Sequence, residues 1–299
     1  MIKKHFPDFL GIGAQRSGTT WLYKNLNNHP QIWTPPIKEI HFFDALGEFS
    51  LTQRYYKRHL RKRVYNYVFK NREKLSAVNI WWDINYFTGK RDFNWYSSLF
   101  QPSSNQIAGE ITPSYSTLDK SIVEKIHTLN PNLKIIFLMR DPIERDWSSA
   151  IKGLARDKKR DARQISNEKF LKKVNSKGVS KRGNYIQTLG IWEEIFPPSQ
   201  IHIDFYDEIQ ENPEDVLLRI FDFLNISVDE KYIPSNVHDK VNSTDGYKIK
   251  IPPIIEKHIA RSNIEQLKIL NQRFGGHTTK WLERTITILE QDNNHDSRE

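Results

Sequence analysis

The feature that most constrains the fold is a segment near the N-terminus in which an apolar strand leads through a short loop into a helix. Residues 9–14, with the sequence FLGIGA, have the length and composition of a buried β-strand. A short polar loop follows, and residues 18–28 have the pattern of a helix. A strand, a tight loop and a helix in this order bring backbone N–H groups to a helix N-terminus, where they can bind phosphate. The segment therefore predicts an α/β fold with a phosphate-binding loop at the end of a strand.

Apolar runs alternate with helical patterns along the rest of the chain. Buried strands are expected at residues 107–111, 133–139 and 200–206, and helices at 118–129, 142–155, 185–196, 213–224 and 253–270. This alternation predicts a three-layer, P-loop-like fold with a central, mostly parallel sheet flanked by helices. Because no internal repeat or low-complexity linker interrupts the pattern, we expect one domain over residues 1–290 and a polar, disordered tail at 291–299.

Composition narrows the chemistry that is open to the chain. It has no cysteine, which excludes disulfides, zinc–thiolate sites and cysteine nucleophiles. The N-terminus has no apolar run long enough for a signal peptide or a membrane span, so we expect a soluble cytoplasmic protein. The formal net charge of +9 favours anionic partners such as nucleotides, acidic glycans, nucleic acid or lipid head groups, although a basic surface also serves solubility alone.

Two stretches are strongly basic. Residues 54–74 interleave Lys and Arg with tyrosines, and residues 152–182 are also rich in Lys and Arg. A solvated helix face explains either stretch, and so does a cradle for an acidic acceptor. Aromatic residues among basic ones also suit single-stranded nucleic acid, although nothing in the sequence indicates a specific nucleic-acid partner.

The loop after the first strand departs from both common nucleotide-binding motifs. The dinucleotide fingerprint that Gly11 and Gly13 begin lacks its third glycine, because Arg16 follows instead. Gly13 and Gly18 have the spacing of a Walker A motif, but Thr19 stands where that motif requires lysine. The loop is therefore suited to phosphate but not to the triphosphate of ATP. A P-loop kinase or nucleotidase remains an alternative hypothesis.

The run Arg16-Ser17-Gly18-Thr19-Thr20-Trp21 resembles, position by position, the first signature of the sulfotransferases that use 3′-phosphoadenosine 5′-phosphosulfate (PAPS). The resemblance implies that this loop grips the 5′-phosphosulfate. Arg16 would neutralise the leaving phosphate, while backbone amides near Gly18 and the two threonine hydroxyls would hold it. Trp21 would stack on adenine, and packing in the core is the alternative for this residue.

A second family signature lies at the end of the expected strand 133–139. Arg140 follows this strand, and Ser148 comes eight residues later on the next helix, which Asp141 is expected to cap. The resemblance implies that Arg140 and Ser148 bind the 3′-phosphate of PAPS and of its product, 3′-phosphoadenosine 5′-phosphate (PAP). The carboxyl end of a strand is also where open α/β sheets place their ligands.

Two further segments resemble the heparan-type glycan sulfotransferases and their soluble bacterial relatives. They are Lys38-Glu39-Ile40-His41-Phe42-Phe43-Asp44 and Gly109-Glu110-Ile111-Thr112-Pro113-Ser114-Tyr115. The resemblance assigns the catalytic base to Glu39, whose proton affinity a bound donor would raise. His41, expected on the same strand face, is a second candidate base or orients Glu39. Asp44 and Glu110 are expected to make structural hydrogen bonds, and Ile111 replaces a lysine on the acceptor side.

The resemblance implies in-line transfer of a sulfuryl group from PAPS to a hydroxyl or amine, without a metal. The preferred acceptor is a carbohydrate or glycoconjugate, with an anionic glycan as the expected partner. A C-terminal loop is expected to close over the nucleotide, with Tyr247 at the adenine and Lys248 or Lys250 at the 3′-phosphate. A non-catalytic basic protein that binds glycan or nucleic acid is the remaining alternative. The sequence determines neither the acceptor nor the oligomeric state.

Overall fold

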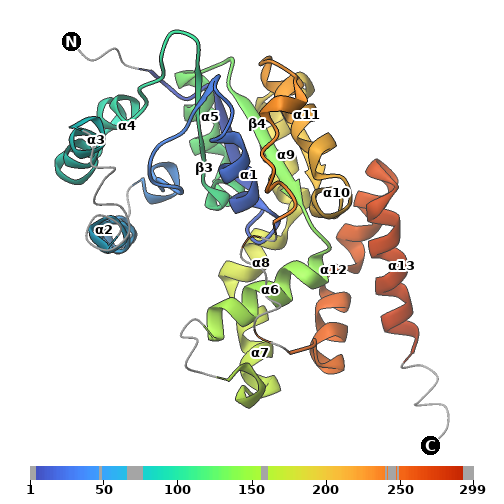
Figure 1. Ribbon diagram of the computed structural model, residues 1–299. Helices are drawn as coiled ribbons and strands as arrows, with labels where there is room; N and C mark the ends of the chain where they lie inside the picture. Colours follow the sequence, from blue (N-terminus) through green and yellow to red (C-terminus); the bar gives the residue numbers. More distant parts are fainter. Residues whose placement is uncertain are drawn as a thin grey trace, which may run out of the picture.

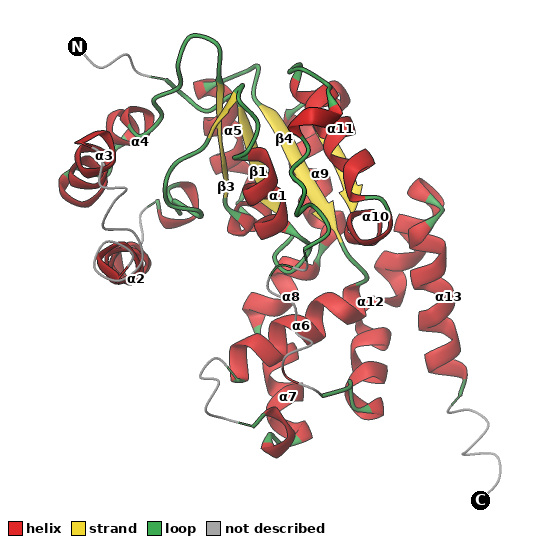
Figure 2. Cartoon of the chain, viewed as in Figure 1, coloured by secondary structure: helices red, strands yellow, loops and turns green. Residues whose placement is uncertain are grey.

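The computed structural model describes residues 5–46, 49–65, 77–155, 161–239, 241, 247 and 249–291. Five strands form its central sheet: β1 (Phe9–Gly13), β2 (Ile32–Trp33), β3 (Ile107–Ile111), β4 (Lys134–Met139) and β5 (Ile201–Phe205). Their order is β2-β3-β1-β4-β5, and all neighbouring strands are parallel. Helices flank this sheet, which confirms the predicted three-layer α/β fold (Figure 2).

The strand order creates a crevice beside β1. From β1 the chain first adds β2 and β3 at one edge of β1, and then β4 and β5 at its other edge, all within the same sheet. Connections that diverge in this way leave a crevice beyond the carboxyl ends of the strands, and open α/β sheets bind ligands there. The residues that follow β1, β3 and β4 therefore meet at one end of the sheet.

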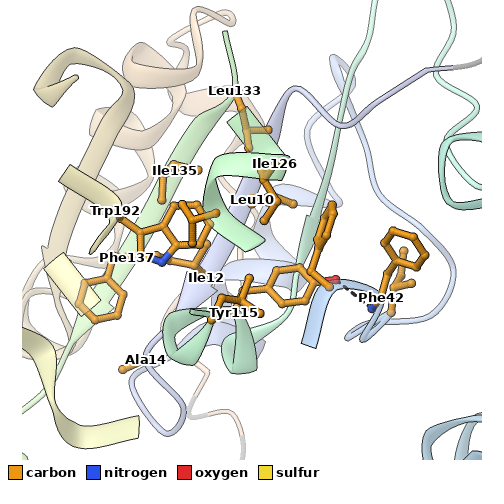
Figure 3. Packing of buried hydrophobic residues seen from close by; sticks show 14 of the residues in the cluster. Leu10, Ile12, Ala14, Phe42, Tyr115, Ile126, Leu133, Ile135, Phe137 and Trp192 are labelled. Atoms are coloured by element: carbon orange, nitrogen blue, oxygen red, sulfur yellow. Dashed lines mark hydrogen bonds between the residues drawn. The ribbon is translucent and has the colours of Figure 1, made fainter. Parts of the chain in front are cut away.

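Alternate strand residues pack into two different cores. Leu10, Ile12 and Phe137 belong to one cluster (Figure 3), while Phe9 and Ile136 belong to a second cluster on the opposite face. The first cluster is covered by α5 (Lys120–Leu129) and α9 (Tyr185–Ile195), and the second by α1 (Thr19–Leu26), α10 (Tyr206–Glu211) and α11 (Pro213–Leu224). A side-chain period of two delivers apolar residues to both faces, as a sheet buried on both sides requires.

A helical layer lies beyond the carboxyl ends of the strands. It contains α6 (Pro142–Leu154), α7 (Asn167–Val174), α8 (Lys177–Gly183), α12 (Pro253–Phe274) and α13 (His277–Glu290) (Figure 1). Ile143, Phe170 and Ile255 share a third core that joins α6, α7 and α12. None of the described helices is long and apolar enough to cross a bilayer.

Three more helices stand beside β3: α2 (Phe49–Tyr65), α3 (Ala77–Thr88) and α4 (Phe93–Ser98) (Figure 1). Three contacts hold α2 against α3, in antiparallel order: Tyr56 with Phe87, His59 with Tyr86 and Arg63 with Asp83. The sequence patterns did not predict β2, α3, α4, α7, α8, α10 or α13 as separate elements. Lys248, the tail from residue 292, and residues 66–74 and 156–160 of the basic stretches lie outside the described residues.

Candidate active site

The loop between β1 and α1 is fixed by the strand beside it. The Ala14 N–H donates to the Leu138 carbonyl at 2.7 Å, across to β4. Gly18 precedes α1 with a left-handed φ of 85°, and a Cβ at this position would lie 2.8 Å from Ile209 Cδ1. The first amides of α1 have no acceptor within the helix. Thr19 and Thr20, in this first turn, line a pocket.

Three of the predicted donor-site residues meet over this loop. Arg16 Nε donates to Ser148 Oγ at 2.8 Å, and Arg140 Nη1 donates to the Arg16 carbonyl at 3.2 Å. Burial, and then the neighbouring Arg140, lower the pKa of Arg16 below its ordinary value. Because two guanidinium groups share a partly desolvated site, a multiply charged anion is the ligand that stabilises them best.

The segment with Glu39 and His41 is irregular rather than extended. The two residues have φ values of 67° and 55°, a left-handed conformation that is uncommon for non-glycine residues. The expectation that they share a strand face is therefore wrong. The bend nevertheless brings His41 Nε2 to 3.5 Å from Glu39 Oε2. Residues in such conformations persist where their surroundings hold them, and they cluster at functional sites.

A buried hydrogen-bond network holds this bend from behind. The Glu110 carboxylate accepts from the Ile40 N–H at 3.3 Å and from Tyr115 OH at 2.8 Å. Tyr115 Oη accepts in turn from the Phe42 N–H at 3.1 Å (Figure 3). The structural hydrogen bonding expected of Glu110 is confirmed, and it anchors the backbone on both sides of His41.

Two neighbouring side chains, Lys38 and His41, set the charge state of Glu39. Burial raises the pKa of Glu39, but the hydrogen bonds from His41 and Lys38 outweigh it and hold that pKa below its ordinary value. Lys38 Nζ lies 2.8 Å from Glu39 Oε1. The free site therefore holds an ionised carboxylate at neutral pH, and the raised proton affinity expected beside a donor is not a property of the free site.

His41 is enclosed between two carboxylates. Its Nδ1 lies 2.7 Å from Asp44 Oδ2, as expected for a structural role of Asp44, and its ring stacks on Tyr55 with 3.6 Å between centroids. Burial lowers the pKa of His41, but the hydrogen bonds to Asp44 and Glu39 raise it above its ordinary value overall. His41 has 3% of its surface exposed and contacts both Glu39 and Asp44, an arrangement expected of a residue that orients Glu39.

A basic cleft connects the phosphate loop with Glu39. One pocket of about 380 Å³ contains Arg16, Thr19 and Glu39 in its wall, and an adjoining pocket of about 840 Å³ contains Glu39 and His41. The walls of the two pockets also include Arg54 and Arg58 of α2, Lys152 of α6, Lys173 of α7 and Arg182 of α8. Parts of both basic stretches therefore converge on the same cleft.

The sequence profile of the sulfotransferase family matches residues 7–230. This chain belongs to the sulfotransferase family. The membrane-associated sulfotransferase kil1 of Dictyostelium discoideum is 23% identical over 90% of this chain and 66% of that protein. Human heparan sulfate glucosamine 3-O-sulfotransferase 6 is 25% identical over 82% of this chain and 58% of that protein. The chain thus spans only part of the length of these curated relatives.

Solved sulfotransferases share the fold. The enzyme from Alicyclobacillus acidocaldarius superposes with a TM-score of 0.63 at 20% identity, covering 92% of this chain and 98% of the other. A mouse sulfotransferase complexed with PAP superposes with a TM-score of 0.51 at 14% identity, covering 94% of this chain and 89% of the other. At these identities the likeness establishes the P-loop-like fold and no more than the fold.

Lys152, the first residue of the second basic stretch, lines the cleft of this sulfotransferase, although no individual role was predicted for it. Burial, and then the nearby Arg16, lower the pKa of Lys152 to about 8. The signal that was available is its position four residues after Ser148, because residues one helical turn apart lie on the same helix face.

The remaining residues expected at the nucleotide differ in their burial and in their distance from the phosphate loop. Trp21 packs in the core, the alternative given for this residue, with 4% of its surface exposed and its indole N–H donating to the Val237 carbonyl at 2.7 Å; its stacking on adenine stays a prediction. Tyr247 is half-buried and lies close enough to Arg16 to influence its pKa. Lys250 is exposed, and Ser17 is buried within the loop.

Proposed function

We propose that this sulfotransferase uses PAPS as its donor and transfers the sulfuryl group to a hydroxyl or amine of an acidic carbohydrate or glycoconjugate. One observation carries this proposal: Arg16 and the ionised Glu39 line the same pocket, and Arg140 lies directly behind Arg16, donating to its carbonyl oxygen. Cations for a polyanionic donor and a carboxylate for the acceptor proton are the two requirements of sulfuryl transfer without a metal. The mouse neighbour with bound PAP supports this choice of donor.

The donor end of the crevice is assigned to Arg16, Arg140 and Ser148. Arg140 and Ser148 bind the 3′-phosphate, and the first turn of α1, with Thr19 and Thr20, binds the 5′-phosphosulfate. Arg16 places positive charge at the bridging oxygen, where negative charge develops as the bond to sulfur breaks. This arrangement uses a helix N-terminus and fixed guanidinium groups that are already in place before the donor arrives.

The acceptor end is assigned to Glu39. As the acceptor oxygen or nitrogen attacks sulfur, Glu39 takes its proton, a bond from the acceptor to sulfur forms, and PAP leaves with the electron pair of the broken S–O bond. The lowered pKa keeps Glu39 ionised in the free enzyme, and the negative charge of the bound donor then raises its affinity for the proton. His41 is assigned as a positioning residue, because it ties the Glu39 carboxylate to Asp44.

The walls of the cleft favour an acceptor with negative charge of its own. Ile111, which stands where a lysine was expected, is fully buried and approaches Gly11, so it contributes nothing to the cleft. Arg54, Arg58 and Arg182 supply the positive charge from other helices. Relatives that are named for heparan sulfate support an acidic glycan as the acceptor class.

The acceptor class is tested with a double variant, Arg54→Ala with Arg58→Ala. We expect KM for an acidic oligosaccharide to rise about tenfold with little change in kcat, because these side chains attract the acceptor without touching the reacting atoms. Added salt should inhibit the wild type more steeply than the variant. Transfer from radiolabelled PAPS to acidic and neutral oligosaccharides of equal length provides the measurement.

The matched control removes two positive charges elsewhere, with Lys231→Ala and Lys268→Ala, whose side chains are exposed on the short 3₁₀ helix Glu230–Tyr232 and on α12. This control should leave KM unchanged. Equal turnover of acidic and neutral oligosaccharides by the wild type would refute an acidic acceptor, while leaving the choice of PAPS as donor intact.

A further inference from the structure

Exposed apolar side chains gather on the helices beside β3. Among the described residues, eleven large apolar side chains are exposed, and seven of them lie on α2, α3 or α4 or directly at their ends. They are Leu60, Val64, Tyr65, Ile80, Trp81, Ile84 and Phe93, whereas Val228, Ile254, Ile269 and Ile286 lie singly elsewhere. A concentration of this kind on one part of a monomer marks an interaction site, while single exposed apolar residues are ordinary.

The antiparallel packing of α2 and α3 shows that these side chains share one side of the pair. Leu60 and Val64 directly follow the two residues of α2, His59 and Arg63, that contact α3. They therefore lie about 100° around α2 from these contacts, on its exposed side. Ile84 directly follows Asp83, which contacts α2, and Ile80 lies one helical turn before Ile84. Both are therefore rotated around α3 in the same direction from its contacts with α2, away from the buried Trp82. Both helices are right-handed, they run antiparallel, and on each the exposed residues are rotated in the same sense from the helix contact. The two sets of side chains therefore emerge on the same side of the helix pair. We call Leu60, Val64, Ile80 and Ile84 the outer face; Trp81, also exposed, lies farther around α3 from its contacts with α2.

Positive charge borders the outer face along α2. Lys57, Leu60, Arg61 and Val64 follow the spacing i, i+3, i+4, i+7, which forms one stripe of a helix. The 17 residues of α2 include six Lys or Arg residues and no Asp or Glu. Apolar and aromatic side chains beside a uniformly basic helix have the composition of helices that lie in the headgroup region of a bilayer.

We propose that the outer face docks this protein on an anionic lipid bilayer. Apolar side chains would enter the headgroup boundary, while Lys57 and Arg61 would contact anionic headgroups. A second copy of the chain fits this face less well, because a symmetric contact would bring two basic α2 helices together and like charges repel. The charge of the face therefore selects an anionic surface as its partner.

Docking would also orient the basic cleft. Lys57 and Arg61 also line the pocket of about 840 Å³ that contains Glu39, so the cleft opens beside the docked surface rather than opposite to it. Acceptors displayed at the bilayer would then lie close to Glu39. The docking itself goes beyond the proposed transfer reaction and does not depend on which donor or acceptor the cleft uses.

Vesicle flotation tests the docking. The wild-type chain should float with vesicles of phosphatidylcholine and about 30% phosphatidylserine, and should float much less with phosphatidylcholine alone or at high salt. Ile84→Glu should lower the bound-to-free ratio at least about tenfold, because it puts a carboxylate at the apolar boundary. Ile254→Glu is the matched control, since Ile254 and Ile84 are both 56% exposed, and it should float like the wild type.

The absence of cysteine permits a second, local measurement. Ile84→Cys and Ile254→Cys each accept one environment-sensitive fluorophore, and only the label at position 84 should shift to the blue when anionic vesicles are added. Both glutamate variants should keep the melting temperature and PAP affinity of the wild type. Equal flotation of Ile84→Glu and Ile254→Glu would overturn the proposal. So would a wild-type dimer in light scattering that Ile84→Glu converts to a monomer without any vesicle binding.

Discussion

Replacing Glu39 by glutamine is expected to lower kcat for sulfuryl transfer about 1,000-fold, within the range that a positioned general base contributes. The amide keeps the size of the side chain but does not take up the acceptor proton. Affinity for PAP should stay within about twofold, because Glu39 is assigned to the acceptor and not to the nucleotide. Steady-state transfer from radiolabelled PAPS and calorimetric titration with PAP give the two quantities.

The control for this variant is Glu124→Gln, an exposed glutamate on α5 outside the cleft, which should behave like the wild type. His41→Asn distinguishes the two candidate bases. It should lower kcat less than Glu39→Gln does, and by a similar factor across the pH range, because it loosens the carboxylate without removing it. If His41→Asn abolished transfer while Glu39→Gln retained more than about a tenth of the rate, His41 would be the base instead.

Replacing Arg16 by methionine is expected to lower kcat/KM for PAPS about 100- to 1,000-fold, the range measured when one preorganised charge-stabilising donor is removed from an active site. Methionine fills similar space but leaves the departing phosphate oxygen without its cation. The lost hydrogen bond to Ser148 costs about 1 kcal/mol of folding free energy, so the variant should stay folded.

Arg16→Lys separates charge from shape in the same experiment. It should recover part of the lost rate, since an ammonium group supplies charge but not the planar fork of a guanidinium. Melting temperatures of both variants should remain close to that of the wild type. A rate for Arg16→Met within about threefold of the wild type, in a folded protein, would contradict the assignment of Arg16 to the leaving group.

The strands and the phosphate loop could be predicted from the sequence because their signals are local. Strand β4 is a continuous apolar run, and the observed strand at residues 134–139 differs from the expectation by one residue. The loop before α1 could be predicted because Gly18 adopts a left-handed backbone conformation, with a φ of 85°, that glycine adopts without steric cost. The two-residue strand β2 is too short to show any period, and it went unnoticed for that reason.

The walls of the cleft were less predictable, because they arise from tertiary packing. Arg54, Lys152 and Arg182 lie far apart in the chain, and only the folded helices bring them to one pocket. From the sequence alone, a row of charged residues on a helix predicts a solvent-exposed face, because the surface that it meets in the folded protein is not known. The left-handed backbone at Glu39 and His41 also depends on distant residues, since Glu110 and Tyr115 hold the bend.

The most direct test of the donor assignment is calorimetric titration of the wild type and Arg140→Ala with PAP, ADP and ATP, without magnesium. We expect PAP to bind at least about 100-fold more tightly than ADP or ATP, because only PAP carries the 3′-phosphate that Arg140 and Ser148 are proposed to bind. Arg140→Ala should remove this preference. If ATP bound as tightly as PAP, or if Arg140→Ala bound PAP like the wild type, the PAPS-dependent assignment would be contradicted and a P-loop kinase or nucleotidase would take its place.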